Sequence, residues 1–147
     1  MKLELKSLKI VAALSEETTC FSAVLLADGK QVGRVSNRGH GGPNEYQWTD
    51  RALGKQVEEW AAKQPTEFEF EKLDQLVDGL MNHAEILASL KRRTKKVTWF
   101  RLKGDKAKEW RIVKAPFSPE VKRFLVGKYP NLEIVANEDL EAAVAYC

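Results

Sequence analysis

Residues 19–50 read TCFSAVLLADGKQVGRVSNRGHGGPNEYQWTD, and this segment predicts the arrangement of the first half of the chain. Residues 19–27 are rich in β-branched and aromatic side chains, which favour a β-strand. Asp28-Gly29 is a strong hairpin signal, because glycine accepts the positive φ of a tight turn. Residues 31–37 then form the expected return strand, so the sequence predicts an antiparallel hairpin.

Two registers of this hairpin, which differ by one residue, fit the sequence. A two-residue loop would pair Leu25 with Val32, whereas a three-residue loop with a bulge would pair Val24 with Val32. The sequence does not choose between the two.

Apolar periodicity and turn signals outside the hairpin predict the remaining elements. We expect strands over residues 3–13, 45–48, 97–102, 109–114 and 132–136, and helices over residues 51–64, 68–94, 118–128 and 138–146. This order, ββββ-αα-ββ-α-β-α, predicts an α+β fold of antiparallel hairpins with the helices packed on one side of the sheet or sheets. We expect a single domain, 1–147, with residues 94–96 as the best candidate for a seam, and one sheet or two remain open.

Helix boundaries are predicted from capping residues. Thr49 and Asp50 are both good N-caps for the first helix, Ser118-Pro119-Glu120 starts the third, and Asn137 is the expected cap of the last. The long helix is expected to carry acids at its start, Glu67, Glu69 and Glu71, and bases at its end, as the helix dipole favours.

Charge is spread unevenly over a chain whose formal net charge is only +3. Residues 91–114 hold eleven Lys and Arg against two acids, a local charge of +9. The rest of the chain has 13 basic and 19 acidic residues, which leaves it at −6. Such polarity favours either an anionic partner for the basic segment or pairing of opposite surfaces between subunits.

Composition narrows the class of protein. Apolar residues make up 44% of the chain, and no apolar run reaches the roughly 20 residues of a membrane-spanning helix. The first residues, MKLELKSLKIVAAL, lack the pattern of a secretory signal, so we expect a cytoplasmic protein that does not contact membranes. Cys20 and Cys147 have neither disulfide nor metal-ligand spacing, and no catalytic set is recognisable. We therefore expect no metal and no cofactor, and an enzyme is the less favoured class.

The glycine-rich run after the hairpin is the first candidate binding site. Consecutive backbone N–H groups of glycines can form an anion-binding nest, and nearby bases add positive charge. Asparagine and histidine side chains can orient a ligand, and a tyrosine ring can stack on a base. The candidate residues are Arg34, Asn37, Arg38, Gly39, His40, Gly41, Gly42, Asn44 and Tyr46. Turn geometry alone also explains these glycines and asparagines, and both interpretations remain open.

The basic segment is the second candidate site. Its Lys and Arg residues alternate with aromatic residues. Positive side chains bind the phosphates of a nucleic acid, and aromatic rings stack on its nucleobases. The candidate residues are Lys91, Arg92, Arg93, Lys95, Lys96, Trp99, Arg101 and Arg111. Lysines also protect strand edges and gather at helix C-termini, so a solvated face or a protein partner is the alternative.

Two blocks resemble small uncharacterised proteins encoded by phages, prophages and plasmids. They are TTCFSAVLLADGKQVGRVSNRGHGGPNEY and WFRLKGDKAKEWRIVKAPFSPEVKRFLVGKYPN, and the shared feature is a hairpin followed by a V-x-N-x-G-x-G-G loop. The resemblance carries over no catalytic residues. It implies a mobile-element context, in which accessory proteins bind host defence components or sequester their nucleotide signals.

Together these observations favour a non-enzymatic binding protein, expected to be a homo-oligomer. Its loop 37–48 would hold a nucleotide-like anionic ligand or dock on a host protein. The alternatives are a nucleic-acid-binding protein that uses residues 91–114, and an oligomeric structural protein whose acidic helix meets the basic hairpin of another subunit.

Overall fold

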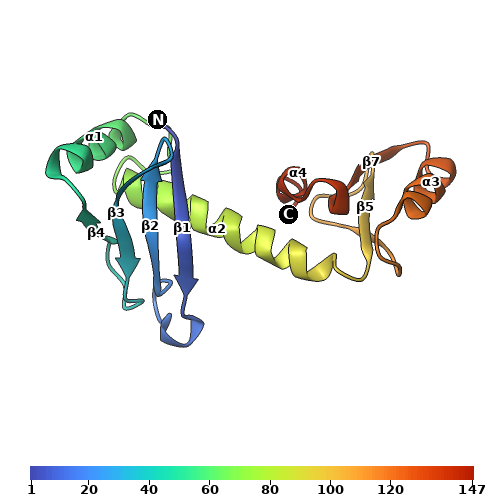
Figure 1. Ribbon diagram of the computed structural model, residues 1–147, viewed down its shortest axis with the longest axis horizontal. Coiled ribbons are helices and arrows are strands. Elements are labelled where there is room, and N and C mark those ends of the chain that lie inside the picture. Colours follow the sequence, from blue (N-terminus) through green and yellow to red (C-terminus); the bar gives the residue numbers. More distant parts are fainter. The chain divides into compact units, whose positions relative to one another are not determined.

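The computed structural model describes residues 1–147, which divide into two compact units, Met1–Asn82 and His83–Cys147. Each unit has its own antiparallel sheet and its own helical cover (Figure 1), so the predicted α+β class is confirmed. The chain therefore forms two sheets and not one. The boundary falls within helix α2 (Lys72–Arg93), upstream of the expected seam at 94–96.

The first unit is built on a four-stranded antiparallel sheet whose spatial order follows the chain, β1-β2-β3-β4. A 3-10 turn, Ala12–Leu14, lies between the first two strands. The strands are β1 (Leu3–Ile10), β2 (Phe21–Ala27), β3 (Lys30–Asn37) and β4 (Glu45–Trp48).

A β-bulge at Val32 sets the register of the β2–β3 hairpin. Ala27 pairs with Lys30 across the two-residue turn, but Leu25 pairs with Gly33, so Val32 faces no partner. Both pairings that the sequence suggested for Val32 are therefore wrong. Val32 and Val35 are three positions apart, which would put them on opposite faces of a regular strand. The extra residue lets both be buried, at 3% and 1% exposure.

One face of this sheet carries the core of the first unit. Alternate residues of β2 are buried from Phe21 to Ala27, as a strand with one covered face requires. Helix α1 (Arg51–Ala62) and the first half of α2 supply the cover. Their buried contributions are Val57, Ala61, Leu73, Val77 and Met81.

The two helices of this unit begin differently from each other. Asp50 caps α1, and its Oδ1 accepts a hydrogen bond of 2.6 Å from the backbone N–H of Ala52. Helix α2 begins at Lys72, so the prediction of a helix from residue 68 is wrong. Residues 67–71 form a bend that ends at Glu71, whose φ of +49° is left-handed. Asp74 is thus the only acid in the first turn of α2.

The second unit is built on a three-stranded antiparallel sheet of order β6-β5-β7. The strands are β5 (Thr98–Leu102), β6 (Arg111–Val113) and β7 (Leu132–Val135). The helices are α3 (Pro119–Lys128), a 3-10 turn Ala136–Glu138, and α4 (Leu140–Val144).

Helices cover both faces of this small sheet. Phe100 and Leu102 of β5 pack with Leu125 of α3, whereas Trp99 packs with Leu90 of α2 and with α4. We expected the helices on one side. In β5, however, the neighbouring residues Trp99 and Phe100 are both apolar and point to opposite faces, so each face of the strand needs its own cover.

The caps in the second unit were predicted in part. Ser118 caps α3, and Pro119 is its first residue, as predicted. Asp139, and not Asn137, caps α4. Asn137 instead accepts from the backbone N–H of Trp99 at 2.9 Å and donates to the carbonyls of Thr94 and Val97, at 3.1 and 2.9 Å. Its amide therefore fixes the entry into β5.

Gly54 on α1 should be intolerant of a side chain. A Cβ there would lie 2.5 Å from Cγ of Trp48. Alanine normally stabilises a helix by about 1 kcal/mol relative to glycine, but at this position the indole must move, and overpacking costs about 1–3 kcal/mol. We expect Gly54→Ala to lower the free energy of unfolding measured by urea titration. Gly79→Ala on α2, where a Cβ meets nothing within 4 Å, should raise it. Equal effects of the two changes would contradict the packing of Trp48 on α1.

Candidate functional site

Asn37 closes the glycine-rich loop onto itself. Its side chain is buried, and Oδ1 accepts hydrogen bonds from Thr18 Oγ1 at 2.7 Å and from the backbone N–H of Gly39 at 2.8 Å. Nδ2 donates to the carbonyl of Gly42 at 3.3 Å and to Asn44 Oδ1 at 3.1 Å. One amide thus ties together both ends of the loop, and none of its bonds goes to solvent.

Gly39 brings the loop against the segment after β1. Its φ is +85°, and a Cβ would lie 2.3 Å from the carbonyl oxygen of Leu14, so only glycine fits. Its carbonyl accepts from the backbone N–H groups of Glu16 and Glu17, at 2.9 and 3.0 Å. The N–H of Gly41 donates to Thr18 Oγ1 at 3.3 Å. Two of the three glycine amides expected to hold an anion are therefore bonded to their own chain.

Asp74 of α2 holds the exit of the loop. Its carboxylate accepts from the backbone N–H of Asn44 at 2.9 Å and from the Tyr46 hydroxyl at 2.5 Å. Burial, followed by the bond to Asp74 and its charge, raises the pKa of Tyr46 far above its ordinary value. The Tyr46 ring is stacked on Trp48, with 5.3 Å between centroids and 6° between planes. One face of the Tyr46 ring is therefore covered.

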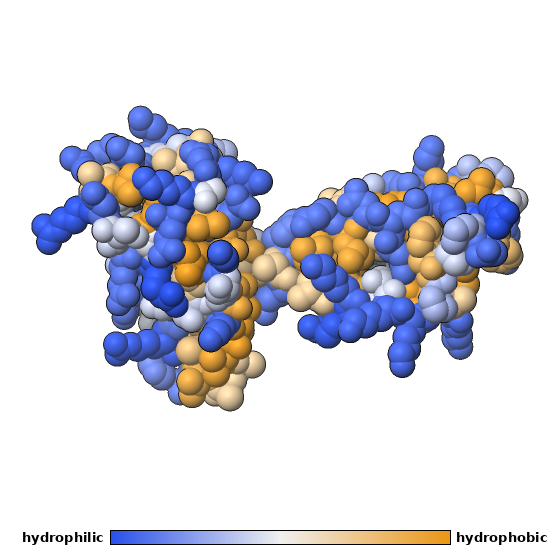
Figure 2. Space-filling model, viewed as in Figure 1, coloured by the Kyte–Doolittle hydropathy of each residue, from blue (hydrophilic) through white to orange (hydrophobic).

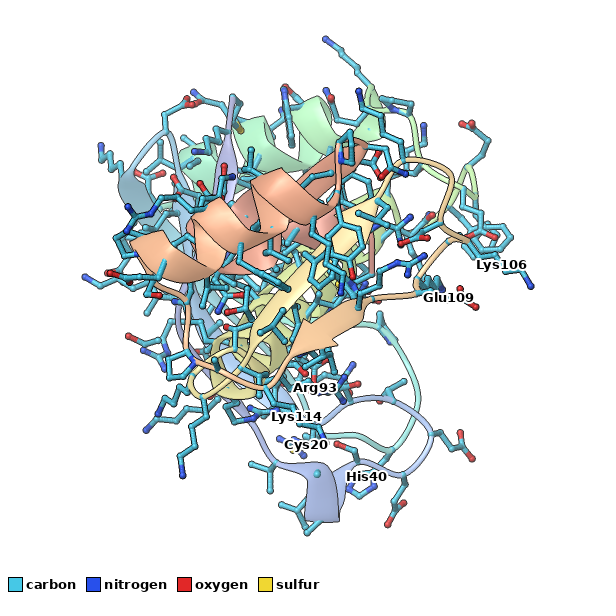
Figure 3. The ribbon with its side chains drawn as sticks, turned by 90° about the vertical axis from the view of Figure 1, so that its right-hand side faces the viewer. Cys20, His40, Arg93, Lys106, Glu109 and Lys114 are labelled. Carbon is cyan, nitrogen blue, oxygen red and sulfur yellow. The ribbon has the colours of Figure 1, made fainter.

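The charged members of the first candidate site point outward. Arg34, Arg38 and His40 are exposed, and His40 Nδ1 lies 3.1 Å from Glu16 Oε2 at the surface of the loop (Figure 3). The loop is thus an internally bonded turn that presents basic side chains, and its role in ligand binding stays a prediction.

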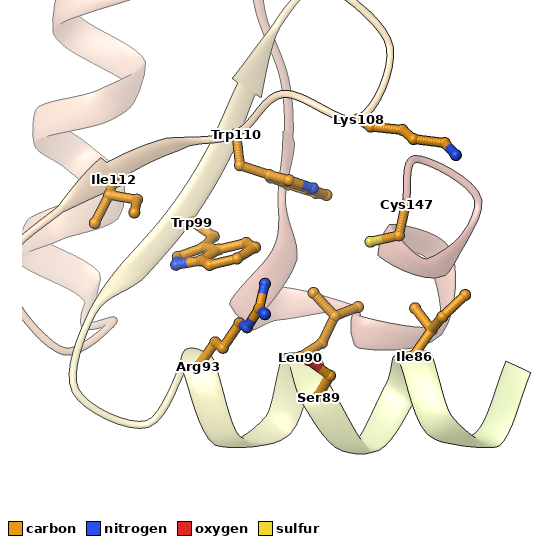
Figure 4. Close-up of a pocket in the computed structure, with 9 residues that line it drawn as sticks. All are labelled: Ile86, Ser89, Leu90, Arg93, Trp99, Lys108, Trp110, Ile112 and Cys147. Carbon is orange, nitrogen blue, oxygen red and sulfur yellow. The ribbon is translucent and has the colours of Figure 1, made fainter. Parts of the chain in front are cut away.

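A groove in the second unit gathers the aromatic part of the basic segment (Figure 4). Its volume is about 380 Å³. The C-terminal half of α2 forms one wall and the β5–β6 hairpin the other, and Cys147 lies at one end. The lining residues are Ile86, Ser89, Leu90, Arg93, Trp99, Lys108, Trp110, Ile112 and Cys147.

Two indole rings and a guanidinium define the chemistry of this groove. The centroids of Trp99 and Trp110 are 5.9 Å apart, with 39° between the rings. The guanidinium of Arg93 lies 5.7 Å from the centre of the Trp99 ring. Nε1 of Trp110 is buried and has no hydrogen-bond acceptor in the protein. Rings beside a cation suit a ligand that is both planar and anionic.

Buried Arg101 holds the hairpin that carries this groove. Its side chain is on the same face of β5 as Trp99, as predicted, but the residue is only 4% exposed. Nη1 donates to the carbonyls of Lys106 and Glu109, at 3.0 and 2.6 Å. The guanidinium also lies 5.0 Å from the centre of the Tyr146 ring. Arg101 therefore positions the connection between β5 and β6, and its charge does not face solvent.

Arg111 forms an ion pair with Asp105 in the same β5–β6 connection. Its Nε and Nη2 donate to the Asp105 carboxylate at 3.0 and 2.9 Å, and Asp105 also accepts from the backbone N–H of Leu102 at 3.0 Å. The bonds from Arg111 and Leu102 lower the pKa of Asp105 to about 2. Arg111 thus closes the turn with a bidentate pair.

The other predicted bases remain at the surface. Lys91, Arg92, Arg93, Lys95 and Lys96 are exposed, and Lys106 and Glu109 project from the hairpin connection (Figure 3). On the face seen in Figure 2, hydrophilic side chains project around the apolar patches of this unit. Residues 83–147 hold fourteen Lys and Arg against eight Asp and Glu, a charge of +6, whereas residues 1–82 hold ten against thirteen, a charge of −3.

Trp110 and Lys108 were not among the predicted site residues. The alternation of basic and aromatic residues in the segment 95–114 indicated both residues. The register of the β5–β6 hairpin was needed to place them in one groove with Trp99. The wall from α2 had a weaker signal, since its residues also fit an ordinary core-facing stripe.

Comparison with known proteins gives no relative. No family model matches the chain, and no curated protein or solved structure matches it. The resemblance to phage and plasmid proteins therefore stays a prediction. No group of His, Cys, Asp and Glu side chains has an arrangement suited to a metal ion. None of the helices combines the length and the apolar character that crossing a membrane requires.

Asn37 should be essential to the stability of the first unit. Asn37→Ala removes four hydrogen bonds and leaves the buried N–H of Gly39 without an acceptor. We expect the free energy of unfolding to fall by about 2–3 kcal/mol in denaturant titration. Asn82→Ala, at an exposed position of α2, is the control and should change it little. An unchanged stability of Asn37→Ala would show that the loop does not depend on this amide.

Asp105 should make the stability depend on pH in the acid range. Its native pKa of about 2 is below its ordinary value of 3.8, so ionised Asp105 favours the folded state above about pH 4. This contribution should be lost as the pH falls from about 4 to about 2. We expect the free energy of unfolding of Asp105→Asn to fall less steeply over that range than that of the original protein. Parallel curves would contradict the Asp105–Arg111 pair.

Proposed function

We propose that the protein binds single-stranded nucleic acid through its second unit, with bases stacking on Trp99 and Trp110 and phosphates meeting the surrounding Lys and Arg. The observation that carries this proposal is the groove that holds two indole rings and Arg93 within the most basic segment of the chain. Aromatic platforms within a positive surface are the general means by which proteins bind single strands without strict sequence preference.

The size and lining of the groove fit a nucleobase. A volume of about 380 Å³ exceeds what one base needs, and apolar side chains from α2, Ile86 and Leu90, form the wall opposite the indoles. Arg93 and Lys108 flank this apolar surface. A base can thus lie against carbon while the phosphates beside it meet ammonium and guanidinium groups.

A single strand fits better than a duplex. The indoles line a groove and do not project from the surface, so a base must leave its own stack to contact them. In a duplex the faces of the bases are covered, and unstacking one costs a few kcal/mol. Unpaired bases do not carry this cost.

The exposed side chains of the first candidate site support a second role. Arg38 and His40 on the loop and Arg34 on the neighbouring strand β3 are exposed, and an anionic ligand or an acidic partner protein, such as a host protein, can dock on these side chains. This role ranks below the first, because the amides of Gly39 and Gly41 already bond to their own chain.

Trp99 should carry a large part of the affinity for single strands. Trp99→Leu keeps an apolar side chain next to Leu90 but removes the ring, and loss of one stacked base costs about 1–3 kcal/mol. We expect the Kd for a labelled oligonucleotide, measured by fluorescence anisotropy, to be 5- to 150-fold higher. Trp60→Leu, a half-buried tryptophan of α1, is the control and should leave the Kd unchanged. Equal binding by all three proteins would contradict the proposal.

The salt dependence of the same binding separates phosphate contacts from stacking. Lys95→Ala and Lys96→Ala should each reduce the slope of log K against log salt by about 0.7, the value for one phosphate of a single strand. Arg123→Ala on α3, whose side chain is 76% exposed, is a charge-matched control and should leave the slope unchanged.

A further inference from the structure

The bend before α2 exposes two phenylalanines between three acids. Phe68 and Phe70 are 50% and 64% exposed, and their rings stack with 5.4 Å between centroids. Glu67, Glu69 and Glu71 alternate with them and are also exposed. We call residues 67–71 the acidic aromatic bend. Exposed aromatic side chains rimmed by charge mark a contact surface, because burying them in a partner removes apolar area from water.

Side chains of α2 hold this bend in one conformation. Gln75 accepts from the backbone N–H of Phe68 at 3.1 Å and donates to the carbonyls of Phe68 and Phe70, at 2.9 and 2.7 Å. Thr66 Oγ1 donates to the carbonyl of Phe68 at 2.7 Å. Lys72 Nζ lies 3.1 Å from Glu69 Oε2. The two rings are thus presented by an ordered turn, which lowers the entropy cost of binding.

The acidic aromatic bend is complementary to the groove of the second unit. The bend offers two stacked rings with carboxylates on both sides, and the groove offers two indoles with Arg93 and Lys108 beside them. The bend therefore has the same alternation of ring and anion as a short single strand. The opposite net charges of residues 1–82 and 83–147 extend this complementarity over the surrounding surfaces.

We propose that the protein self-associates by inserting the acidic aromatic bend of one copy into the Trp99–Trp110 groove of a second copy. The contact is between two different surfaces, so each copy offers one bend and one groove. Two copies satisfy both contacts when the exchange is reciprocal, and a chain of copies forms when it is not.

Self-association and nucleic-acid binding then compete for one groove. This consequence rests on the proposed function, but the self-association itself does not. A single strand added to the associated protein displaces the bend, and a protein without the aromatic bend binds the strand more tightly, because no competitor must leave.

Charge reversal on the two surfaces tests the proposal. One variant carries Glu67→Lys and Glu69→Lys, and the other carries Arg93→Glu and Lys108→Glu. Each alone places like charges in both contacts, so each should sediment as a monomer at concentrations where the original protein associates. An equimolar mixture restores opposite charges in both contacts and should sediment as an associated species. A mixture that remains monomeric, or an original protein that is monomeric up to about 100 µM, where contacts of micromolar Kd are populated, would overturn the proposal.

Removal of the rings provides a second test with a matched control. Phe68→Ser with Phe70→Ser should weaken self-association at least tenfold, because exposed aromatic side chains that become buried dominate interfaces. Phe124→Ser on α3, where the ring is 51% exposed, should leave it unchanged. An unchanged association of the double variant would also overturn the proposal.

The same variants separate this inference from the proposed function. Binding of a labelled oligonucleotide by a monomeric original protein would support the proposed function and overturn self-association. Self-association that requires Phe68 and Phe70, in a protein that binds no oligonucleotide, would do the reverse. If both hold, the double variant should bind the oligonucleotide at least as tightly as the original protein.

Discussion

Helix α2 is the element on which both units depend, because its apolar stripe supplies buried side chains to two separate cores. Leu73, Val77 and Met81 recur at four-residue spacing and pack under the four-stranded sheet. Leu90, further along the same helix, lies in the cluster that covers the Trp99 face of the three-stranded sheet. Burying each such side chain contributes about 1.5–3 kcal/mol. A sheet without this helix would expose one apolar face to water.

The groove of the second unit depends on a buried cation. Arg101 would be costly to bury without partners, and three carbonyls of the β5–β6 connection, together with the rings of Tyr146 and Trp110, supply them. The connection is therefore fixed from inside by Arg101 and from outside by the Asp105–Arg111 pair. This double attachment keeps Lys108 and Trp110 opposite the C-terminal half of α2. The positive charge of Arg101 thus stabilises the fold. The exposed Lys and Arg side chains remain free to bind a partner.

The glycine-rich loop and the basic groove illustrate two uses of polar residues. In the loop, the Asn37 side chain bonds to Gly39, Gly42 and Asn44, and Asp74 accepts from the backbone N–H of Asn44. These hydrogen bonds close the turn between β3 and β4. In the groove, Arg93 and Lys108 lie beside two indole rings that are only partly buried. The groove therefore retains free hydrogen-bond donors and apolar area, and both contribute to the binding of a ligand.

Local patterns in the sequence predicted the α+β class, the Asp28-Gly29 hairpin, the cap of α3 and the basic aromatic segment, and they offered Thr49 and Asp50 as alternative caps of α1. These features follow from local rules of turn geometry, capping and periodicity, which act within a few residues. The bulge at Val32, the start of α2 at Lys72 and the burial of Arg101 became apparent only in the folded chain. Each of these depends on a partner distant in the sequence or on which face of a strand is covered, and neither can be read from neighbouring residues. The groove itself exists only because α2 and the β5–β6 hairpin pack together, which brings Arg93, Trp99 and Trp110 to one place.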